Sequence, residues 1–576
     1  SIFTKNNCLL KYFVYFFLSF YYFLGIGQEK YSKEYFQPPL KIPIVLSGTF
    51  GELRNNHFHS GLDIKTQGKE GLEVISVADG YVSRIKVNQF GYGKSIYVTH
   101  PNGFTSVYAH LSKFAPKIES YVKSIQYKKE CYEIEETRFS EDTFPIEKGE
   151  IIAFSGYTGG SGGPHLHFEI RDTESEKIIN PLFFNFAIQD TIAPIFQSVK
   201  VYSLSENSHV NQQNNHFQLP IKEIADGEYI ADKISAQNLI GFGLEVFDKT
   251  NSANNRLGIY SLEMQVNGQS MYYHDLETFD FAESKFINLH IDYEHFKKYK
   301  TRFQKTYLEP ANALSTYKNV INFGKINIEK QFNYTVNIIA KDFYGNASML
   351  KIPVASQEAA TILNKKKDST AFKIIAKNFN KFSVEDVTIA FPKNTFYENT
   401  YLDFKVENGI AKIHNPTIPL DDYFTLTFDV SKYSEEEKKQ LYIANVEYPK
   451  YPRYLYTRKK DSIFFTTTKY LGNYSLLFDN QKPTIKLMYL KDGQWVSNSE
   501  TLKVKINDIG SGINTYRATI NDEWILMEYN HKTGILTYNF DDKKLVGSEH
   551  LFKVVVYDNV GNTNELSSTF FKKQVN

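Results

Sequence analysis

The stretch Gly162–Arg171 reads Gly-Gly-Pro-His-Leu-His-Phe-Glu-Ile-Arg, and it decides how the first part of the chain folds. Its glycines and proline form a turn, and the residues after them alternate as in a β-strand, whose side chains point to opposite faces in turn. His165 and His167 then share one face, and Leu166 and Phe168 share the other. Two imidazoles in one small volume suit a metal site, an acid–base site or both. Two hydrogen-bonded histidines on a half-buried strand are the structural alternative.

The composition predicts several domains made mostly of strands. A chain of 576 residues is too long for one hydrophobic core, and about 150 residues per domain predicts roughly three to five domains. Lys and Arg number 66 and Asp and Glu 65, with no long run of one sign, so the charge pattern indicates no nucleic-acid partner. The aromatic content of 15% favours strands, because aromatic rings suit a pleated, half-buried surface.

The first 27 residues have the pattern of a signal peptide. Lys5 and Lys11 precede an apolar run that ends in Gly25 and Gly27, and we expect cleavage before Gln28. The run of about 15 apolar residues is shorter than the roughly 20 that a membrane-spanning helix needs. We therefore expect an exported protein that has no stable membrane span after cleavage and no intrachain disulfide, since one cysteine would remain.

Residues 28–187 are predicted to form one antiparallel β domain. Short apolar runs separated by glycine turns fill the region from about 45 to 182, as expected for such a domain. An insertion at about 117–143 interrupts them with a charged, helix-tolerant segment, for which we expect a helix and a loop on the rim.

Two pairs of motifs recur in the remainder of the chain. Asp190-Thr-Ile-Ala-Pro returns as Asp479-Asn-Gln-Lys-Pro, and a strand that runs into Asp342-Phe-Tyr-Gly-Asn returns as one that runs into Asp558-Asn-Val-Gly-Asn. The glycine and asparagine of these turns accept positive φ. One carboxylate per turn supplies few of the oxygen ligands that calcium needs, so we expect a structural role for these aspartates.

An opening Asp-x-x-x-Pro and a closing strand and turn resemble bacterial immunoglobulin-like sandwich modules. The sequence between the two copies alternates apolar and polar residues and predicts another β-sandwich, with a short helix near Ser434–Leu441. The predicted order after the first domain is a module with a long insertion near 280–330, a β-sandwich and a last module, at 188–355, 356–480 and 481–576.

The histidines outside the opening stretch complete a set that suits metal-assisted hydrolysis. A tetrahedral catalytic zinc takes three nitrogen or oxygen ligands and keeps one open position, and His59, Asp63 and His167 can supply these ligands. The spacing of His59 and Asp63 lets a turn bring both to one ion. His110 and His165 are then free to flank the water and the substrate, since a neighbouring imidazole takes and returns protons.

Three blocks carry a resemblance to a known family: His59-Ser-Gly-Leu-Asp63, Tyr108-Ala-His-Leu111 and Gly163-Pro-His-Leu-His-Phe-Glu169. In this order they resemble the lysostaphin-like (LytM-type) zinc peptidases, which cut peptide cross-links of peptidoglycan. The resemblance covers residues 45–182, about a quarter of the chain, and reaches the tail Ile179–Leu182.

The resemblance implies one Zn²⁺ ion held by His59, Asp63 and His167, with His110 and His165 as the catalytic pair. It leaves open which of the pair is the base and which stabilises the oxyanion. Two features depart from the family. The chain has Ser161-Gly-Gly-Pro164 where Ser-Thr-Gly-Pro is usual, which we expect to loosen the turn, and it has the insertion at 117–143.

Three further residues near these blocks receive weaker assignments. The sequence spacing between His57 and Asp63 departs from the family spacing, so we expect His57 to lie at the surface or to support a metal ligand. His100 is expected to be a turn residue. Glu169 either supports a ligand from outside or is a solvated carboxylate at the strand end.

The sequence thus predicts an exported zinc metalloendopeptidase that hydrolyses peptide bonds in peptidoglycan stem peptides or cross-links. One alternative is a catalytically inactive wall-binding or amidase-activating protein. Another is an adhesin or scaffold whose function resides in the sandwich modules. Export without a wall-anchoring motif at the end of the sequence favours the periplasm of a Gram-negative bacterium. The sandwich modules are candidates for contacts with envelope proteins.

Overall fold

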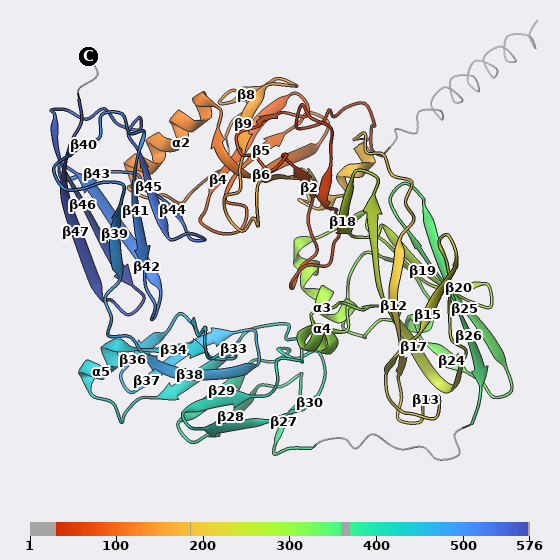
Figure 1. Ribbon diagram of the computed structural model, residues 1–576. Helices are drawn as coiled ribbons and strands as arrows, with labels where there is room; N and C mark the ends of the chain where they lie inside the picture. The colour runs from red at the N-terminus through yellow and green to blue at the C-terminus, as the bar shows by residue number, and fades with distance from the viewer. Residues whose placement is uncertain (1–29, 138, 185, 359–368, 574–576) are drawn as a thin grey trace, which may run out of the picture.

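The computed structural model describes residues 30–573 except 138, 185 and 359–368. The predicted signal peptide lies outside these residues. In the described ranges, no helix is long and apolar enough to cross a membrane. The chain is mostly β, as its composition predicts, and its parts follow one another around a ring (Figure 1). We call them the first part (30–187), the second part (188–358), the third part (369–480) and the fourth part (481–573).

The first part is built on an antiparallel sheet whose centre is the strand predicted from the paired histidines. This strand, β10 (His165–Asp172), pairs antiparallel with β2 (Leu62–Lys65) and β6 (Phe104–Phe114). It places His167 opposite both Asp63 and Ala109. Its apolar face is in the hydrophobic core, where Leu166 and Phe168 are fully buried. The strand order is β1 (Leu46–Gly48), β2 (Leu62–Lys65), β10 (His165–Asp172), β6 (Phe104–Phe114), β5 (Lys94–Thr99), β4 (Gly80–Val87) and β7 (Ile134–Thr137).

The insertion in the first part contains the predicted helix, α2 (Pro116–Lys129). It begins with a proline, whose fixed φ suits the first turn, and ends at Glu130 in the left-handed conformation. Ile118, Val122 and Gln126 lie on one face and are buried. The rest of the insertion is not only a loop, because β7 pairs with β4 and extends the sheet. The prediction was right for the helix and missed this strand.

The second part contains a large sheet and an inserted segment that reaches the first part. Its inserted segment carries η2 (Phe281–Phe286), α3 (Ile287–His290), α4 (Tyr293–Tyr299) and the strand β21 (Thr278–Phe279), which pairs with β11 (Ile178–Ile179) of the first part. The order of the main strands is β14 (Phe217–Leu219), β12 (Ile195–Ser203), β17 (Ile234–Thr250), β26 (Ala347–Ser356), β25 (Asn333–Lys341), β19 (Ser261–Val266), β20 (Gln269–Asp275) and β23 (Tyr317–Val320).

The third part is a sandwich of two five-stranded sheets that share one hydrophobic cluster. The short helix predicted near Ser434 is present as α5 (Glu435–Gln440), with a complete capping box between Ser434 and Glu437. One sheet has the order β28 (Asn380–Val384), β29 (Val387–Phe391), β33 (Phe424–Asp429), β37 (Ile463–Thr468), β36 (Arg458–Lys460). The other has the order β31 (Phe404–Glu407), β32 (Ile410–Ile413), β38 (Gly472–Phe478), β34 (Leu441–Asn445), β35 (Arg453–Tyr454).

The fourth part is a smaller sandwich with its own hydrophobic cluster. The predicted domain boundaries at 187, 355 and 480 stay predictions. The two sheets of the fourth part have the orders β39 (Thr484–Met488), β41 (Thr501–Asn507), β45 (Ile535–Asn539), β44 (Glu528–Asn530) and β40 (Gln494–Trp495), β47 (Thr563–Phe571), β46 (Glu549–Asp558), β42 (Ile513–Ile520), β43 (Glu523–Trp524).

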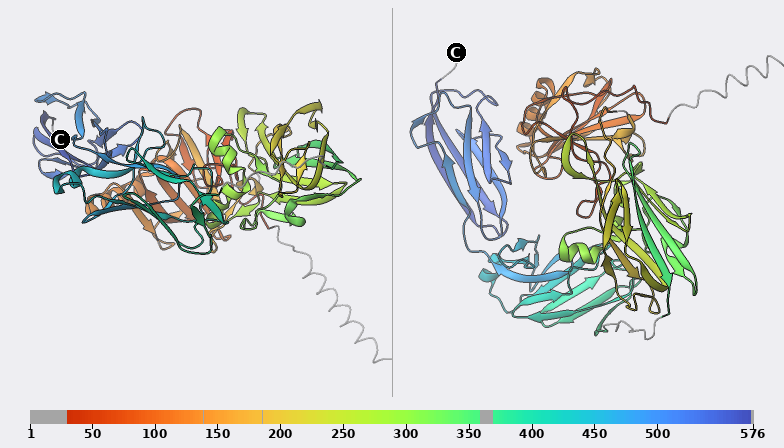
Figure 2. Two further views of the ribbon diagram at one scale, coloured as in Figure 1. Left: turned by 90° about the horizontal axis from the view of Figure 1, so that it is seen from below. Right: turned by 45° about the vertical axis from the view of Figure 1, so that its right-hand side comes forward.

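The fourth part returns to the first part and closes the ring, as the right-hand view of Figure 2 also shows. Lys94 is buried against Glu528 at 2.9 Å, and the ring of Tyr127 on α2 packs edge-on against Trp524 with centroids 5.3 Å apart. Two further ion pairs join the same surfaces, Arg517 with Glu130 and Lys123 with Asp542.

Candidate metal centre

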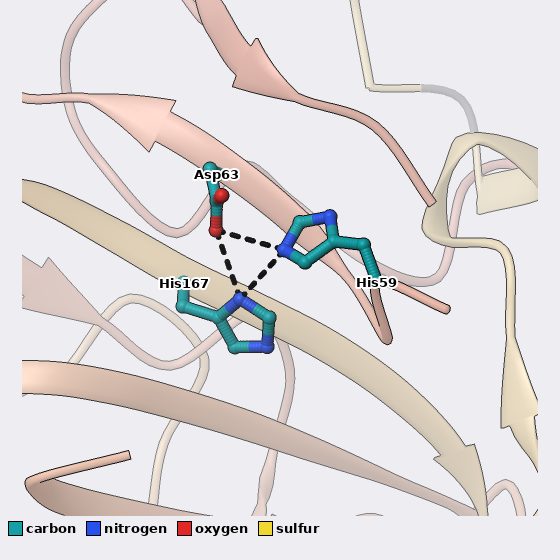
Figure 3. Close-up of side chains that lie close together, drawn as sticks. All are labelled: His59, Asp63 and His167. Carbon is teal, nitrogen blue, oxygen red and sulfur yellow. Dashed lines mark hydrogen bonds and ion pairs between the residues drawn. The ribbon is translucent and has the colours of Figure 1, made fainter. Parts of the chain in front are cut away.

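Three side chains converge between β2 and β10, as Figure 3 shows. Oδ1 of Asp63 lies 3.0 Å from Nε2 of His59 and 2.9 Å from Nδ1 of His167, and the two nitrogens are 3.1 Å apart. Asp63 and His167 face each other on paired strands, and His59 immediately precedes the first of these strands. All three side chains are buried. The three predicted ligands therefore form one cluster.

The outer nitrogens of both histidines are held by groups that can only accept a hydrogen bond. Nδ1–H of His59 donates to the carbonyl of Thr49 at 2.7 Å, and Nε2–H of His167 donates to the carboxylate of Glu169 at 2.9 Å. In the neutral rings, the inner nitrogens then carry lone pairs that point into the cluster. Two imidazole nitrogens and one carboxylate oxygen are a donor set that zinc accepts, so the residues present fit this ion.

Glu169 is fully buried and contacts the cluster through His167. One carboxylate oxygen accepts hydrogen bonds from His167, Ser60 and Tyr92, and the other accepts two from Arg171 at 2.8 and 2.6 Å. Burial raises the pKa of this carboxyl, but Arg171 and His167 hold it well below its ordinary value. Of the two roles predicted for Glu169, the structure agrees with the supporting one.

The charge on Asp63 is stabilised by its neighbours. Burial raises its pKa, but His59, His165 and His167 together hold it well below the ordinary value. Its second oxygen accepts a hydrogen bond from Arg54 at 3.2 Å. For His167, burial lowers the pKa and the two carboxylates that it contacts raise it to about 9.

The two predicted catalytic histidines lie beside this cluster. Nδ1–H of His110 donates to the carbonyl of Thr158 and that of His165 to the carbonyl of Gly163, each at 2.9 Å, so Nε2 of each ring carries a lone pair. The two rings are 4.9 Å apart, and Nε2 of His165 is 3.4 Å from Oδ1 of Asp63. Burial and the nearby histidines lower the pKa of His110 to about 3. Its φ of 59° is unusual for a residue other than glycine and is common at functional sites.

The turn before the paired histidines keeps a hydroxyl contact despite its departure from the family pattern. The buried hydroxyl of Ser161 donates to the carbonyl of Gly163 at 2.6 Å and lies 3.2 Å from Nδ1 of His165. This serine therefore helps to fix the carbonyl that orients the His165 ring.

The second part of the chain holds the loop that carries His59. The backbone N–H of Phe58 donates to the hydroxyl of Ser284 at 2.8 Å, and the hydroxyl of Thr49 accepts from the N–H of Gly258 at 2.9 Å. These partners are 226 and 209 positions apart in the sequence. Local sequence patterns carry no signal for contacts at such separations, and sequence reasoning missed them. It also missed Ser60, Tyr92 and Arg171.

Two other histidines lie outside the cluster. His57 is exposed and contacts the carbonyl of Asn55, in agreement with a surface position. His100 stands at the start of the predicted turn, but its ring is buried. There Nδ1–H donates to the carbonyl of Asp79 at 2.8 Å, and Nε2 accepts from Ser106 at 2.7 Å.

Comparisons with known proteins identify two regions of the chain. Residues 57–127 match the model described as peptidase family M23, a range that includes His59, Asp63 and His110 and ends within α2. Residues 373–479, in the third part, match the model of a Zu5-like domain.

Similar proteins match a limited share of the chain. An uncharacterized metalloprotease of Haemophilus influenzae is 31% identical over 160 residues, which are 27% of this chain and 28% of that protein. The DD-carboxypeptidase/endopeptidase Mpg of Neisseria meningitidis serogroup B is 33% identical over 113 residues, 20% of each chain. The chain thus spans less than a third of the length of these relatives.

Among solved structures, the catalytic domain of lysostaphin from Staphylococcus simulans aligns with 24% of this chain and 88% of its own, with 23% identity and a TM-score of 0.18. The match over residues 57–127 and the two relatives agree with the resemblance in the three sequence blocks. Within the first part of this chain, residues 57–127 therefore match peptidase family M23.

Proposed function

We propose that this protein is an exported zinc metallopeptidase that hydrolyses peptide bonds in peptidoglycan. The observation that carries the proposal is the convergence of His59, Asp63 and His167, with His110 and His165 beside them, in a part of the chain that matches a peptidase family. None of the five residues is replaced. One relative is named a DD-carboxypeptidase/endopeptidase, which supports stem peptides as the substrate.

The metal would be held by Nε2 of His59, Oδ1 of Asp63 and Nδ1 of His167. Zinc held by these residues would supply a water whose pKa is lowered to about 7 and would polarise a carbonyl group. The outward hydrogen bonds to Thr49 and Glu169 keep the two imidazoles in the tautomer and orientation that this requires.

His110 and His165 would handle protons. Both rings are fixed by a backbone carbonyl at Nδ1, so each offers Nε2 as an acceptor on the side of the cluster. An imidazole that has accepted a proton there becomes an N–H donor, either to the leaving amine nitrogen or to the carbonyl oxygen as its charge develops. The fixed orientation removes the entropic cost of placing these groups for each reaction.

We place the reaction in the envelope of a Gram-negative bacterium. The N-terminal pattern predicts export, and peptidoglycan lies outside the cytoplasm. The relatives from Haemophilus influenzae and Neisseria meningitidis support this location.

Digestion of isolated sacculi tests the proposal. Residues 28–576, purified and loaded with zinc, should release muropeptides whose masses show new amino and carboxyl termini. Chelation should stop the release, and added Zn²⁺ should restore it. Intact sacculi after incubation with the zinc-loaded protein would contradict the proposal and favour the non-catalytic, wall-binding alternative. Sacculi of defined chemistry, analysed by mass spectrometry, would identify the bond that is cut.

A further inference from the structure

Two clusters of three aspartates stand apart from the candidate metal centre. One consists of Asp190, Asp248 and Asp342 in the second part, and the other of Asp479 at the end of the third part with Asp508 and Asp558 in the fourth part. In each cluster, carboxylate oxygens from all three residues lie within 4.8 Å of one another. The repeated sequence motifs contain only the first and last aspartate of each set. The middle one comes from elsewhere in the fold, Asp248 within β17 and Asp508 just after β41, so the sequence alone suggests one carboxylate per turn where the structure has three.

In the first cluster, the middle aspartate has an unpartnered oxygen. Asp248 is only 4% exposed, and within the described residues its Oδ1 has no hydrogen-bond partner. Asp342 is 2% exposed and is oriented by Asn346, whose backbone N–H and side-chain amide both donate to it. Burial and the charges of Asp190 and Asp342 raise the pKa of Asp248 to about 8. A buried carboxylate among two others is unfavourable unless a cation lies between them.

The second cluster repeats this arrangement. Asp558 is fully buried, and its Oδ1 accepts hydrogen bonds from the three backbone N–H groups of the turn that follows it. Oδ2 of Asp508 accepts from the N–H groups of Gly510 and Gly512, whereas its Oδ1 is buried and, in the part of the chain that the structure describes, unpartnered. Asp479 is 2% exposed and accepts from Ser511. Two modules thus present the same three carboxylates in the same order, each with an unpartnered oxygen on the middle residue.

The donor atoms indicate which ion fits. Both clusters offer oxygen only, which hard cations prefer, whereas the cluster of His59, Asp63 and His167 offers nitrogen as well. Calcium binds six to eight oxygens at about 2.3–2.6 Å, so two ligands on opposite sides of the ion are about 4.6–5.2 Å apart. Magnesium needs a near-ideal octahedron and retains several waters, for which these buried clusters are less suited. We propose that each aspartate cluster binds one Ca²⁺ ion.

Both proposed sites lie where two parts of the chain meet. At the first, one cavity is lined by Asp190 and Asp248 together with Leu46 and Leu182 of the first part. Phe343, next to Asp342, packs edge-on against Phe183 of the first part at 5.0 Å between ring centroids. A cation here would tie the second part to the domain that carries the metal centre.

At the second site, Asp479 follows the last strand of the third part, and its N–H donates to the carbonyl of Gln440 there. Its own carbonyl accepts from the side chain of Asn562, which also bonds Asp558 in the fourth part. A cation shared by Asp479, Asp508 and Asp558 would therefore fix the joint between the third and fourth parts. This inference does not depend on the proposed peptidase activity.

Calcium binding by the full chain tests the inference. Residues 28–576, stripped with EGTA and reloaded with zinc, are titrated by calorimetry with Ca²⁺ up to about 1 mM, the range of extracellular calcium modules. We expect two ions per chain, one in Asp248→Asn, one in Asp508→Asn and none in the double variant. Asp226→Asn, in an exposed turn of the second part, should still bind two. An excess of Mg²⁺ should not displace the bound Ca²⁺.

Hydrogen exchange of the wild-type chain provides a second readout that needs no variant. Calcium should slow exchange in the turns at 342–346 and 558–562, and leave exchange unchanged in β28, which lies in the other sheet of the third part. Binding of no Ca²⁺ by the wild-type chain, or of two ions by the double variant, would overturn the inference. Equal displacement by Mg²⁺ would overturn the assignment to calcium, and unchanged exchange at both turns would overturn the placement of the ions.

Discussion

Glu169→Gln tests whether the proposed zinc site depends on the carboxylate that accepts a hydrogen bond from His167. This residue accepts the Nε2–H of His167 on one oxygen and the guanidinium of Arg171 on the other, and it is fully buried. Glutamine has the same shape, but it has one carbonyl oxygen and one NH₂ group. Whichever way it turns, an N–H group then faces either His167 or Arg171, and neither can accept a hydrogen bond.

The substitution should have two effects, one on metal affinity and one on stability, each with a typical magnitude. Loss of a carboxylate behind a metal-bound histidine typically weakens metal affinity by about 10–100-fold. The variant also leaves Arg171 buried, with Glu176 as its remaining ion-pair partner at 3.7 Å. Breaking a buried ion pair costs roughly 3–5 kcal/mol in stability. We therefore expect both weaker zinc binding and a lower unfolding temperature.

Competition with a chromophoric chelator measures the zinc affinity, and thermal unfolding with and without zinc measures the stability. The matched control is Glu174→Gln, because Glu174 is exposed in the turn after β10. A folded Glu169→Gln protein whose zinc affinity is within about twofold of the wild type would refute the reasoning. It would mean that the orientation of His167 does not depend on this carboxylate.

Three further predictions concern the metal centre, the contact that holds its loop, and a buried histidine. His167→Ala should lose zinc, whereas His165→Ala should retain zinc and lose turnover, as metal analysis and sacculus digestion would show. Ser284→Ala should weaken zinc binding several-fold, because the buried N–H of Phe58 next to the His59 loop loses its acceptor, at a cost of about 1–3 kcal/mol. The fold around His100 should lose stability as the pH falls from 6.5 to 4. Burial lowers the pKa of His100 to about 4, so the unfolded chain takes up a proton that the folded one excludes.

Each of these predictions has a contradicting outcome. Full metal occupancy in both histidine variants would contradict the division of roles between His165 and His167. For Ser284→Ala the control is Ser315→Ala, whose hydroxyl is in an exposed contact with Glu283, and equal zinc affinities would contradict a role for the second part. The loss at His100 amounts to about 3 kcal/mol by pH 4 and should be absent in His100→Gln. Equal pH dependence of hydrogen exchange in β5 and β6 of the two proteins would contradict it.

Much of the fold could be predicted from local patterns. Alternation placed the strand through His165 and His167, and the run at Ser434 predicted α5, because both signals come from a few neighbouring residues. The pairing of β7 with β4 could not be predicted, since a short charged segment at a sheet edge has no distinctive periodicity. The contact between β21 and β11 also depends on an insertion from another part of the chain.

The candidate site also has residues that the sequence predicts and contacts that it does not. His59 and Asp63 are four positions apart, and the strand pattern fixes the face of His167. Only the family resemblance predicts that His167, 104 positions from Asp63, joins them. The supports for this cluster are different. Ser284 lies 226 positions from the backbone group that it holds. Asp248 joins two aspartates from separate turns only because strands pair over long distances. Such contacts are a property of the tertiary fold.

The contacts that close the ring join two surfaces that the chain already holds near each other. Ion pairs at a protein surface, such as Arg517 with Glu130, contribute about 0–1 kcal/mol each, too little to hold two free molecules together. The chain, however, confines the two surfaces to a small volume, where the effective concentration is on the order of millimolar. In about 1 M salt the screening length falls to about 3 Å, which weakens the exposed pairs. Buried Lys94 and the packing of Tyr127 against Trp524 are screened far less, so we expect the ring to stay closed. Small-angle scattering would test this, because expansion of the protein at high salt would show that the exposed ion pairs hold the ring.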